Sequence, residues 1–265
     1  DGEVIVIKVP KRAEPDEAIS PAGDDIEVIY QDKGMIAVDK PAGLAVHPAG
    51  RRVYGTLIHW LHSQFRRPDD AAHDVVPRLL HRLDRETSGL VMASLNPDLH
   101  AQIAIQFENR QVTKTYQAVV HGAPPAEEGV IDFSIGPARG SEIKLKLEAR
   151  VDGSGLSALT HYRVLRQSGR YTLVELRPKT GRTHQLRVHM AALGCPLVGD
   201  KIYGVEDAVF LEYLNDSLSE ATKARLVLDR HALHSASIEF FHPWEDRNMT
   251  LQASLPSDMT DLLGS

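Results

Sequence analysis

One aspartate lies between two arginines in a run whose flanks indicate a loop. The run reads Leu79-Leu80-His81-Arg82-Leu83-Asp84-Arg85-Glu86-Thr87-Ser88-Gly89. Guanidinium groups near a carboxyl group lower its pKa, so we expect Asp84 to be ionised at neutral pH and suited to act as a nucleophile or base. The charge pattern alone is more typical of a surface ion-pair network.

A second run gathers hydrogen-bond donors at a turn that leads into a helix. It reads Leu176-Arg177-Pro178-Lys179-Thr180-Gly181-Arg182-Thr183-His184-Gln185-Leu186-Arg187-Val188-His189-Met190. Arginines and helix N-termini both bind phosphate, and Arg182 could instead turn inward to hold a carboxylate. A solvated basic helix face fits the same composition equally well.

Together the two runs resemble the signatures of the RluA-type family of RNA pseudouridine synthases. These signatures are His-Arg-Leu-Asp followed by Ser/Thr-Gly, and Gly-Arg-Thr/Ser-His-Gln-Leu/Ile-Arg-Val-His. The resemblance spans about residues 26–255, and long motifs in the same order are far more specific than a single short one. It also includes Asp39-Lys40-Pro41-Ala42-Gly43-Leu44-Ala45-Val46-His47, Lys114-Thr115-Tyr116, Gly199-Asp200-Lys201-Ile202-Tyr203-Gly204 and Leu233-His234.

The resemblance implies a role for each matched residue. Asp84 is the essential aspartate, Arg182 is its ion-pair partner, and Tyr116 packs on the target uracil and can remove its C5 proton. Leu186 packs on the base, and Arg82 enters the RNA stack from which the uridine has been extruded, because a buried base must leave the helix before it can react. The implied substrate-binding residues are His81, Arg82, Lys114, His184, Gln185, Leu186 and Arg187.

The implied reaction is an isomerisation in which the bond between uracil N1 and ribose C1′ breaks, the base turns, and C5 rejoins C1′. It requires no cofactor and no metal. An ionised Asp84 either attacks C1′ or removes the 2′ proton, and the residues leave both routes open. The implied substrate is RNA, with 23S ribosomal RNA of the large subunit as the first choice and transfer RNA as the alternative.

Other classes of site fit the sequence less well. Asp84 and Glu86 would share one face if this run were a strand, so a two-carboxylate glycoside hydrolase is a remote alternative. A non-catalytic RNA-binding protein is the other remote alternative. The chain has 13 histidines, but His184 and His189 lie about 140° apart around a helix rather than on one face. The loop Gly43–Gly50 lacks the Lys-Ser/Thr of a phosphate loop.

Strands are the main elements around these runs, and helices interrupt them without regular alternation. We therefore predict an α+β fold with a mostly antiparallel, mixed central sheet, flanked by helices and loops around an active-site cleft. A hairpin is expected at 26–41, further strands at 89–94, 114–121, 129–135, 156–164, 171–177 and 234–241, and helices at 56–65, from the cap Asn96 to about 110, 184–193 and within 206–228.

Composition is that of a globular protein. The 265 residues are 42% hydrophobic and 25% charged, which excludes disordered and fibrous classes. We expect a cytoplasmic monomer without a membrane segment. The net charge of −6 comes from residues 1–32, which hold nine acidic and three basic residues. The rest of the chain holds equal numbers of acidic and basic residues. A locally basic face near 177–187 is therefore possible, and the net charge does not exclude RNA binding.

The N-terminal residues form a separate unit in this interpretation. Residues 1–25 are expected to be a residual strand and an acidic linker, and residues 26–265 the catalytic domain. Gly2–Val9 resembles the tail of a small S4-type RNA-binding domain, most of which is absent from the sequence. We therefore hypothesise that the chain is a fragment of a longer protein.

Overall fold

The computed structural model describes residues 26–48 and 54–264. The strand and acidic linker predicted for residues 1–25 lie outside this part of the chain. Within it, no helix is both long and apolar enough to cross a membrane.

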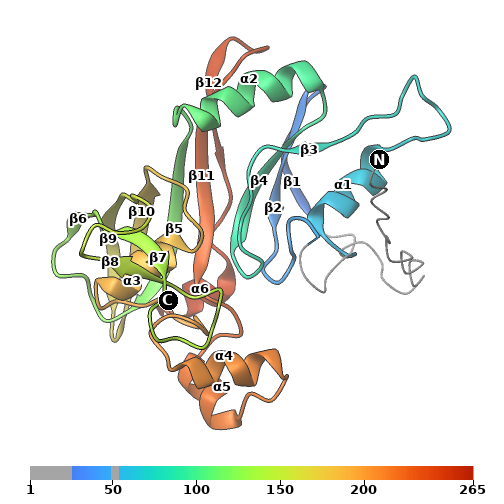
Figure 1. The fold of residues 1–265 in the computed structure, drawn as a ribbon. Coiled ribbons are helices and arrows are strands. Elements are labelled where there is room, and N and C mark those ends of the chain that lie inside the picture. The colour runs from blue at the N-terminus through green and yellow to red at the C-terminus, as the bar shows by residue number, and fades with distance from the viewer. Residues whose placement is uncertain (1–25, 49–53, 265) are drawn as a thin grey trace, which may run out of the picture.

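A ten-stranded sheet forms the centre of the fold (Figure 1). Its strands run in the order β1-β2-β4-β11-β5-β10-β9-β6, with β12 paired to β11 and β3 to β4. All pairs are antiparallel except β4 with β11. The strands are β1 (Glu27–Gln31), β2 (Met35–Lys40), β3 (Arg78–Leu79), β4 (Ser88–Ser94), β5 (Thr113–His121), β6 (Glu128–Ile131), β9 (Thr160–Ser168), β10 (Tyr171–Pro178), β11 (Leu233–His242) and β12 (Arg247–Gln252).

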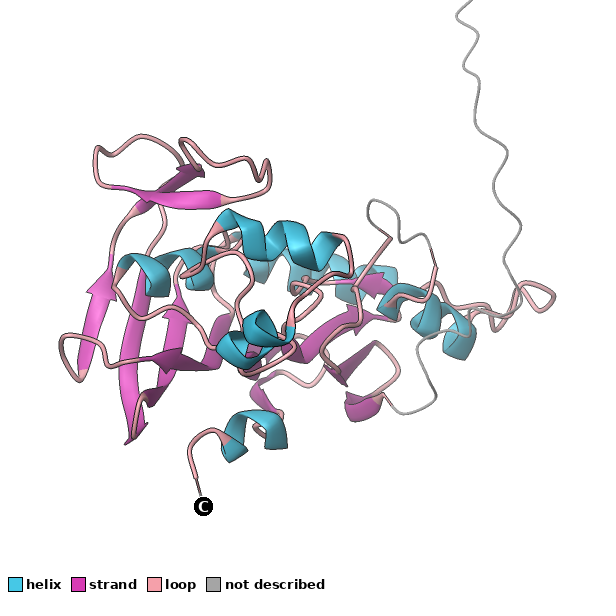
Figure 2. Ribbon diagram, turned by 90° about the horizontal axis from the view of Figure 1, so that it is seen from below, coloured by secondary structure: helices cyan, strands magenta, loops and turns pink. Residues whose placement is uncertain are grey.

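The remaining elements are short. A separate hairpin consists of β7 (Ser134–Pro137) and β8 (Leu147–Arg150). Figure 2 distinguishes the helices from the strands by colour. The helices in the described residues are α1 (Leu57–Phe65), α2 (Pro97–Glu108), α3 (Gln185–Ala192), α4 (Asp207–Leu214), α5 (Glu220–Leu226) and α6 (Ser257–Asp261).

The central strands are buried on both faces. On β2, Ile36 and Val38 pack in one core with residues of α1 and α3, whereas Met35 and Ala37 pack in a second core with residues of α2. Successive side chains of a strand point to opposite faces of the sheet, so the helices cover both of them. The predicted α+β fold with a mostly antiparallel, mixed sheet is therefore confirmed.

Several predicted boundaries were wrong. The strand expected at 129–135 is divided between β6 and β7, and the one expected at 156–164 begins only at Thr160. The helical region expected within 206–228 is broken into α4 and α5 near Asp216, whose φ of 53° is incompatible with a continuous right-handed helix.

The parallel junction between β4 and β11 depends on a glycine. Gly89 pairs with Ser235, has a φ of 107°, and would place an added Cβ within 2.6 Å of Ser235 N and closer still to Ser235 O. We expect Gly89→Ala to lower the free energy of unfolding by at least about 2 kcal/mol in urea denaturation. Gly140→Ala is the control, because its φ of 77° is similar but its Cβ meets open space, and we expect it to cost about 1 kcal/mol. Equal losses for the two variants would show that the junction tolerates a side chain.

Candidate active site

Asp84 lies on a loop between β3 and β4 that is fixed by contacts from the neighbouring segments. The loop turns back on itself through a hydrogen bond from Thr87 N to Asp84 O, at 3.1 Å. Gly43 N donates to Arg85 O at 2.9 Å, and Lys40 Nζ donates to the same oxygen at 3.1 Å. The residues that follow β2 therefore hold the backbone of the aspartate loop.

Lys40 is fully buried and donates to three carbonyl oxygens, those of Pro41, Leu44 and Arg85. A methionine of similar length would leave all three without this donor. Because an unsatisfied buried polar group costs about 1–3 kcal/mol, we expect Lys40→Met to lower the free energy of unfolding by about 2–4 kcal/mol and to loosen the aspartate loop. Lys33→Met, at an exposed position in the turn before β2, is the matched control in thermal unfolding. A loss no larger than that of the control would contradict this role.

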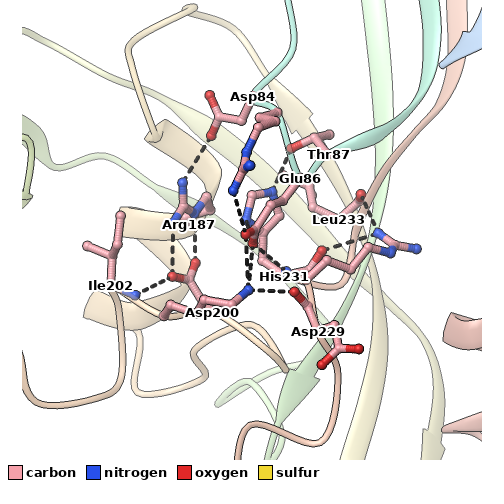
Figure 3. A network of polar contacts seen from close by, with 12 residues as sticks. Asp84, Glu86, Thr87, Arg187, Asp200, Ile202, Asp229, His231 and Leu233 are labelled. Carbon is pink, nitrogen blue, oxygen red and sulfur yellow. Dashed lines mark hydrogen bonds and ion pairs between the residues drawn. The ribbon is translucent and has the colours of Figure 1, made fainter. Parts of the chain in front are cut away.

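Arg187 links the Asp84 carboxylate to a second, deeply buried carboxylate. Its Nη1 donates to Asp84 Oδ2 at 3.1 Å, while its Nε and Nη2 donate to the two oxygens of Asp200 at 2.7 and 2.9 Å. The Asp200 side chain is 0% exposed and also accepts hydrogen bonds from Ile202 N and Tyr203 N. Asp200 thus fixes the guanidinium group of Arg187 by two hydrogen bonds, and the remaining Nη1 donates to Asp84 (Figure 3).

These contacts set the ionisation of the site. Burial by itself would raise the pKa of Asp84, but the charge of Arg187 and its hydrogen bond outweigh burial and lower it below its usual value. The same balance lowers the pKa of Asp200 to about 2. Asp84 is therefore a carboxylate at neutral pH, and its side chain remains 28% exposed, so that it is accessible to a substrate.

The predicted ion pair between Asp84 and Arg182 was wrong. Arg182 precedes α3, and its Nε donates to Ser157 O at 3.0 Å. Arg187 lies within the first turn of α3, where it is 6% exposed and faces the loop. The donor that the sequence indicated is present, but it comes from an arginine five residues further along the chain.

All ten residues that the sequence singled out line one cavity of about 310 Å³. Asp84 is its one carboxylate among the described residues, and Tyr116 on β5 and Leu186 on α3 provide apolar walls, with 8% and 7% of each residue exposed. The ten residues are His81, Arg82, Asp84, Lys114, Tyr116, Arg182, His184, Gln185, Leu186 and Arg187.

The tyrosine and the histidines of this cavity are neutral at pH 7. Burial, and then the negative charge of Asp84, raises the pKa of Tyr116 far above its usual value, so its hydroxyl is protonated. Burial lowers the pKa of His184 to about 4 and that of His81 to about 3. Among these groups, Asp84 is therefore the one that carries a negative charge at pH 7.

Some of the predicted binding residues are engaged within the protein. The Gln185 amide bonds Thr180, Arg182 N, Leu159 O and Thr160, and so it braces the turn that precedes α3. His81 Nε2 accepts from Met92 N at 3.1 Å and its ring stacks on Phe107. Gln185 therefore shapes the cavity, whereas the Nδ1 of His81 is buried without a hydrogen-bond partner among the described residues.

His184 forms the start of α3. It has a φ of 54°, and its Nδ1 lies 2.8 Å from the hydroxyl of Tyr203. The left-handed backbone at this position reverses the chain between the turn and the helix. His184 therefore helps to place Leu186 and Arg187 on the side that faces Asp84.

Glu86 belongs to a separate network beside the site. Its carboxylate accepts from Lys201 Nζ at 3.0 Å and from the Tyr213 hydroxyl at 2.9 Å. His231 contributes its backbone N–H to Glu86 and its Nε2 lies 2.7 Å from the Thr87 hydroxyl (Figure 3). The oxygens of Glu86 are thus engaged by Lys201, Tyr213 and His231, which argues against Glu86 as the free acid of a two-carboxylate glycoside hydrolase.

The supporting residues were missed as functional positions. Lys40, Asp200 and Lys201 stand in motifs that contributed to the family resemblance, but neither motif was assigned a role. An acid next to Gly199 and a lysine before Pro41 are unremarkable in sequence. Their importance arises from burial and from partners that are distant along the chain.

In the part of the chain that the structure describes, no cluster of three or more His, Cys, Asp or Glu side chains is placed to hold a metal ion. His184 and His189, the two histidines that lie five residues apart, have different hydrogen-bond partners. His184 bonds Tyr203, while His189 contacts Thr160 and Phe133 O.

Comparisons with known proteins agree on one family. Residues 34–192 match the family model described as RNA pseudouridylate synthase. The chain is 33% identical over 262 residues to a Bacillus subtilis protein named "Uncharacterized RNA pseudouridine synthase YlyB", which covers 99% of this chain and 79% of that protein. It is 37% identical over 244 residues to a Pseudomonas aeruginosa protein named ribosomal large subunit pseudouridine synthase D, which covers 90% of this chain and 71% of that protein.

A solved structure agrees with the sequence relatives. Human RNA pseudouridylate synthase domain containing 4 is similar to this chain with a TM-score of 0.66 and 29% sequence identity, over 88% of this chain and 90% of the human one.

Proposed function

The chain belongs to the RNA pseudouridylate synthase family, and on that premise we propose that it converts uridine to pseudouridine in large-subunit ribosomal RNA. The observation that carries the proposal is the partly exposed, ionised Asp84, held by Arg187 at a cavity walled by Tyr116 and Leu186. The choice of ribosomal RNA is supported by relatives named for the large ribosomal subunit.

In this proposal the uridine leaves the RNA stack and its base enters the cavity. The ring lies against Tyr116 and Leu186, which exclude water from it, while the ribose lies at Asp84. Arg82 is exposed at the cavity wall and takes the place of the extruded base, because a guanidinium group can both stack on bases and bind phosphate.

The Asp84 carboxylate can start the reaction in two ways. In the first, an oxygen bonds to C1′ while the N1–C1′ bond breaks and its electron pair goes to the uracil. In the second, the carboxylate removes the 2′ proton as the same bond breaks. After uracil has turned, C5 displaces the carboxylate from C1′ in the first route, whereas in the second route C5 bonds to C1′ while Asp84 returns the proton to C2′. In both routes the C5 proton passes to a base and N1 takes up a proton, so the product is an isomer of the uridine. The cation of Arg187 keeps Asp84 ionised for both routes.

Arg182, in this account, contacts RNA rather than Asp84. It lines the cavity from the turn before α3, and its guanidinium group reaches no carboxylate among the described residues. We propose that it neutralises the RNA backbone near the target nucleotide.

The choice of RNA is tested with unmodified transcripts. Purified chain is incubated separately with 23S ribosomal RNA and with a mixture of transfer RNAs, and pseudouridines are then mapped by chemical derivatisation and primer extension. We expect new stops at discrete uridines in the 23S transcript only. Stops confined to transfer RNA would make the alternative substrate the correct one.

A further inference from the structure

A second, strongly basic cavity adjoins the catalytic one. It has a volume of about 220 Å³ and lies between the end of α2 and the start of β5 on one side, and the end of β10 with the following turn on the other. It shares five residues with the catalytic cavity, namely Lys114, Pro178, Thr180, Gly181 and Arg182. The two cavities therefore lie next to each other along these residues.

The charges around this basic cavity are unbalanced. Five cationic side chains line it against the single carboxylate of Glu108. Among the described residues, only one of the five contacts a carboxylate, because Arg177 pairs with Glu175 at 3.2 Å. The five cationic residues are Arg110, Lys114, Arg177, Lys179 and Arg182.

Lys114 is the cation closest to the catalytic cavity, since it lines both. Its ammonium group lies 5.9 Å from the centre of the Phe107 ring and has no hydrogen-bond acceptor among residues 26–48 and 54–264. Burial lowers the pKa of Lys114 from its usual value, with no opposing charge to raise it. Lys114 is partly buried, and a charge that is partly removed from water is costly unless something supplies a counter-charge.

We propose that this basic cavity binds a backbone phosphate of the substrate RNA beside the target nucleotide, with Lys114 at the boundary and Arg110, Lys179 and Arg182 around it. The inference rests on the proposed function, because it places the ligand of the basic cavity on the same strand as the uridine. The shared lining residues favour a polymer whose neighbouring nucleotides occupy both cavities. A phosphodiester supplies the missing anion and accepts hydrogen bonds from several cations at once.

The experiment measures binding of fluorescein-labelled decauridylate by anisotropy at salt concentrations from 50 to 200 mM. Each phosphate contact to a single strand contributes roughly 0.7 to the slope of log affinity against log salt. We expect Arg110→Gln and Lys179→Gln each to weaken binding and to reduce the magnitude of the slope by roughly 0.7–1. Both side chains are exposed, so neither substitution threatens the fold.

Lys33→Gln is the charge-matched control, because Lys33 is exposed and lines neither cavity. Its slope should equal that of the wild type. Unchanged slopes for both Arg110→Gln and Lys179→Gln, or no binding of decauridylate by the wild type at 50 mM salt, would overturn the phosphate site.

Release of tritium from C5-tritiated 23S ribosomal RNA by the wild type is measured separately. Release together with unchanged slopes rejects this inference and leaves the proposed function intact. Reduced slopes without release retain the phosphate site and reject the proposed function.

Discussion

Asp84→Asn is expected to fold, to bind RNA and to be inactive. The amide keeps the shape of the side chain, and Arg187 stays bound to Asp200, so the cavity should persist. An amide cannot attack C1′ or accept the 2′ proton, and loss of the reacting group in a covalent or general-base step typically costs several orders of magnitude. We therefore expect kcat to fall by at least about 10³-fold, measured as tritium released from C5-tritiated 23S ribosomal RNA.

The matched control is Glu127→Gln, an amide substitution at an exposed carboxylate for which we expect wild-type turnover. Urea unfolding and RNA affinity are measured on both variants. Residual activity of Asp84→Asn within tenfold of the wild type would assign the chemistry to another group, since it would show that the carboxylate is dispensable.

Arg187→Met is expected to be the most damaging substitution for stability, and to lower turnover as well. It removes the cation between two carboxylates and leaves the fully buried Asp200 uncompensated. Breaking a buried ion pair in this way costs about 3–5 kcal/mol. The Arg182 side chain hydrogen-bonds only Ser157 O among the described residues, so Arg182→Met should lower the free energy of unfolding by less than about 1 kcal/mol.

Arg187→Lys separates positioning from folding. Lysine retains the charge, but it is a single point donor and cannot hold Asp200 by two bonds while reaching Asp84. We expect a folded protein whose kcat falls by at least about 10²-fold. Its RNA affinity should change much less than its kcat. Full activity in Arg187→Lys, or a loss in Arg182→Met as large as in Arg187→Met, would show that Arg187 does not position the aspartate.

The difference between Arg182 and Arg187 shows what could be predicted from local sequence. Both arginines lie in the same basic run, and either could reach a carboxylate. The choice depends on where α3 begins, at Gln185, and on which helix face packs against the aspartate loop. That packing involves segments about a hundred residues apart, as in the bond between Asp84 and Arg187.

Elements with strong local signals were predicted well. Asn96 accepts hydrogen bonds from Asp98 N and Leu99 N at the start of α2, and Asp32 fixes the turn between β1 and β2 through Gly34 N and Met35 N. The strand β12 was not predicted. Within the part of the chain that the structure describes, β12 pairs with β11 alone, so this strand depends on its partner as much as on its own residues.

The supporting layer behind Asp84 could not be predicted from residue types. Lys40 and Asp200 are charged residues that a sequence would place at the surface, yet both are buried at 0% and 2% exposure. Each is stabilised by partners on other segments, Lys40 by Arg85 O and Asp200 by Arg187. Such positions are identified once the fold brings their partners together.

Release of tritium from C5-tritiated 23S ribosomal RNA by the wild-type chain tests the central claim most directly. Isomerisation exchanges the C5 hydrogen and leaves the base attached to the strand. The account predicts one tritium released per modified uridine, with an intact RNA that contains pseudouridine and no free uracil. Absence of release, or release of free uracil with an abasic site left in the strand, would contradict it.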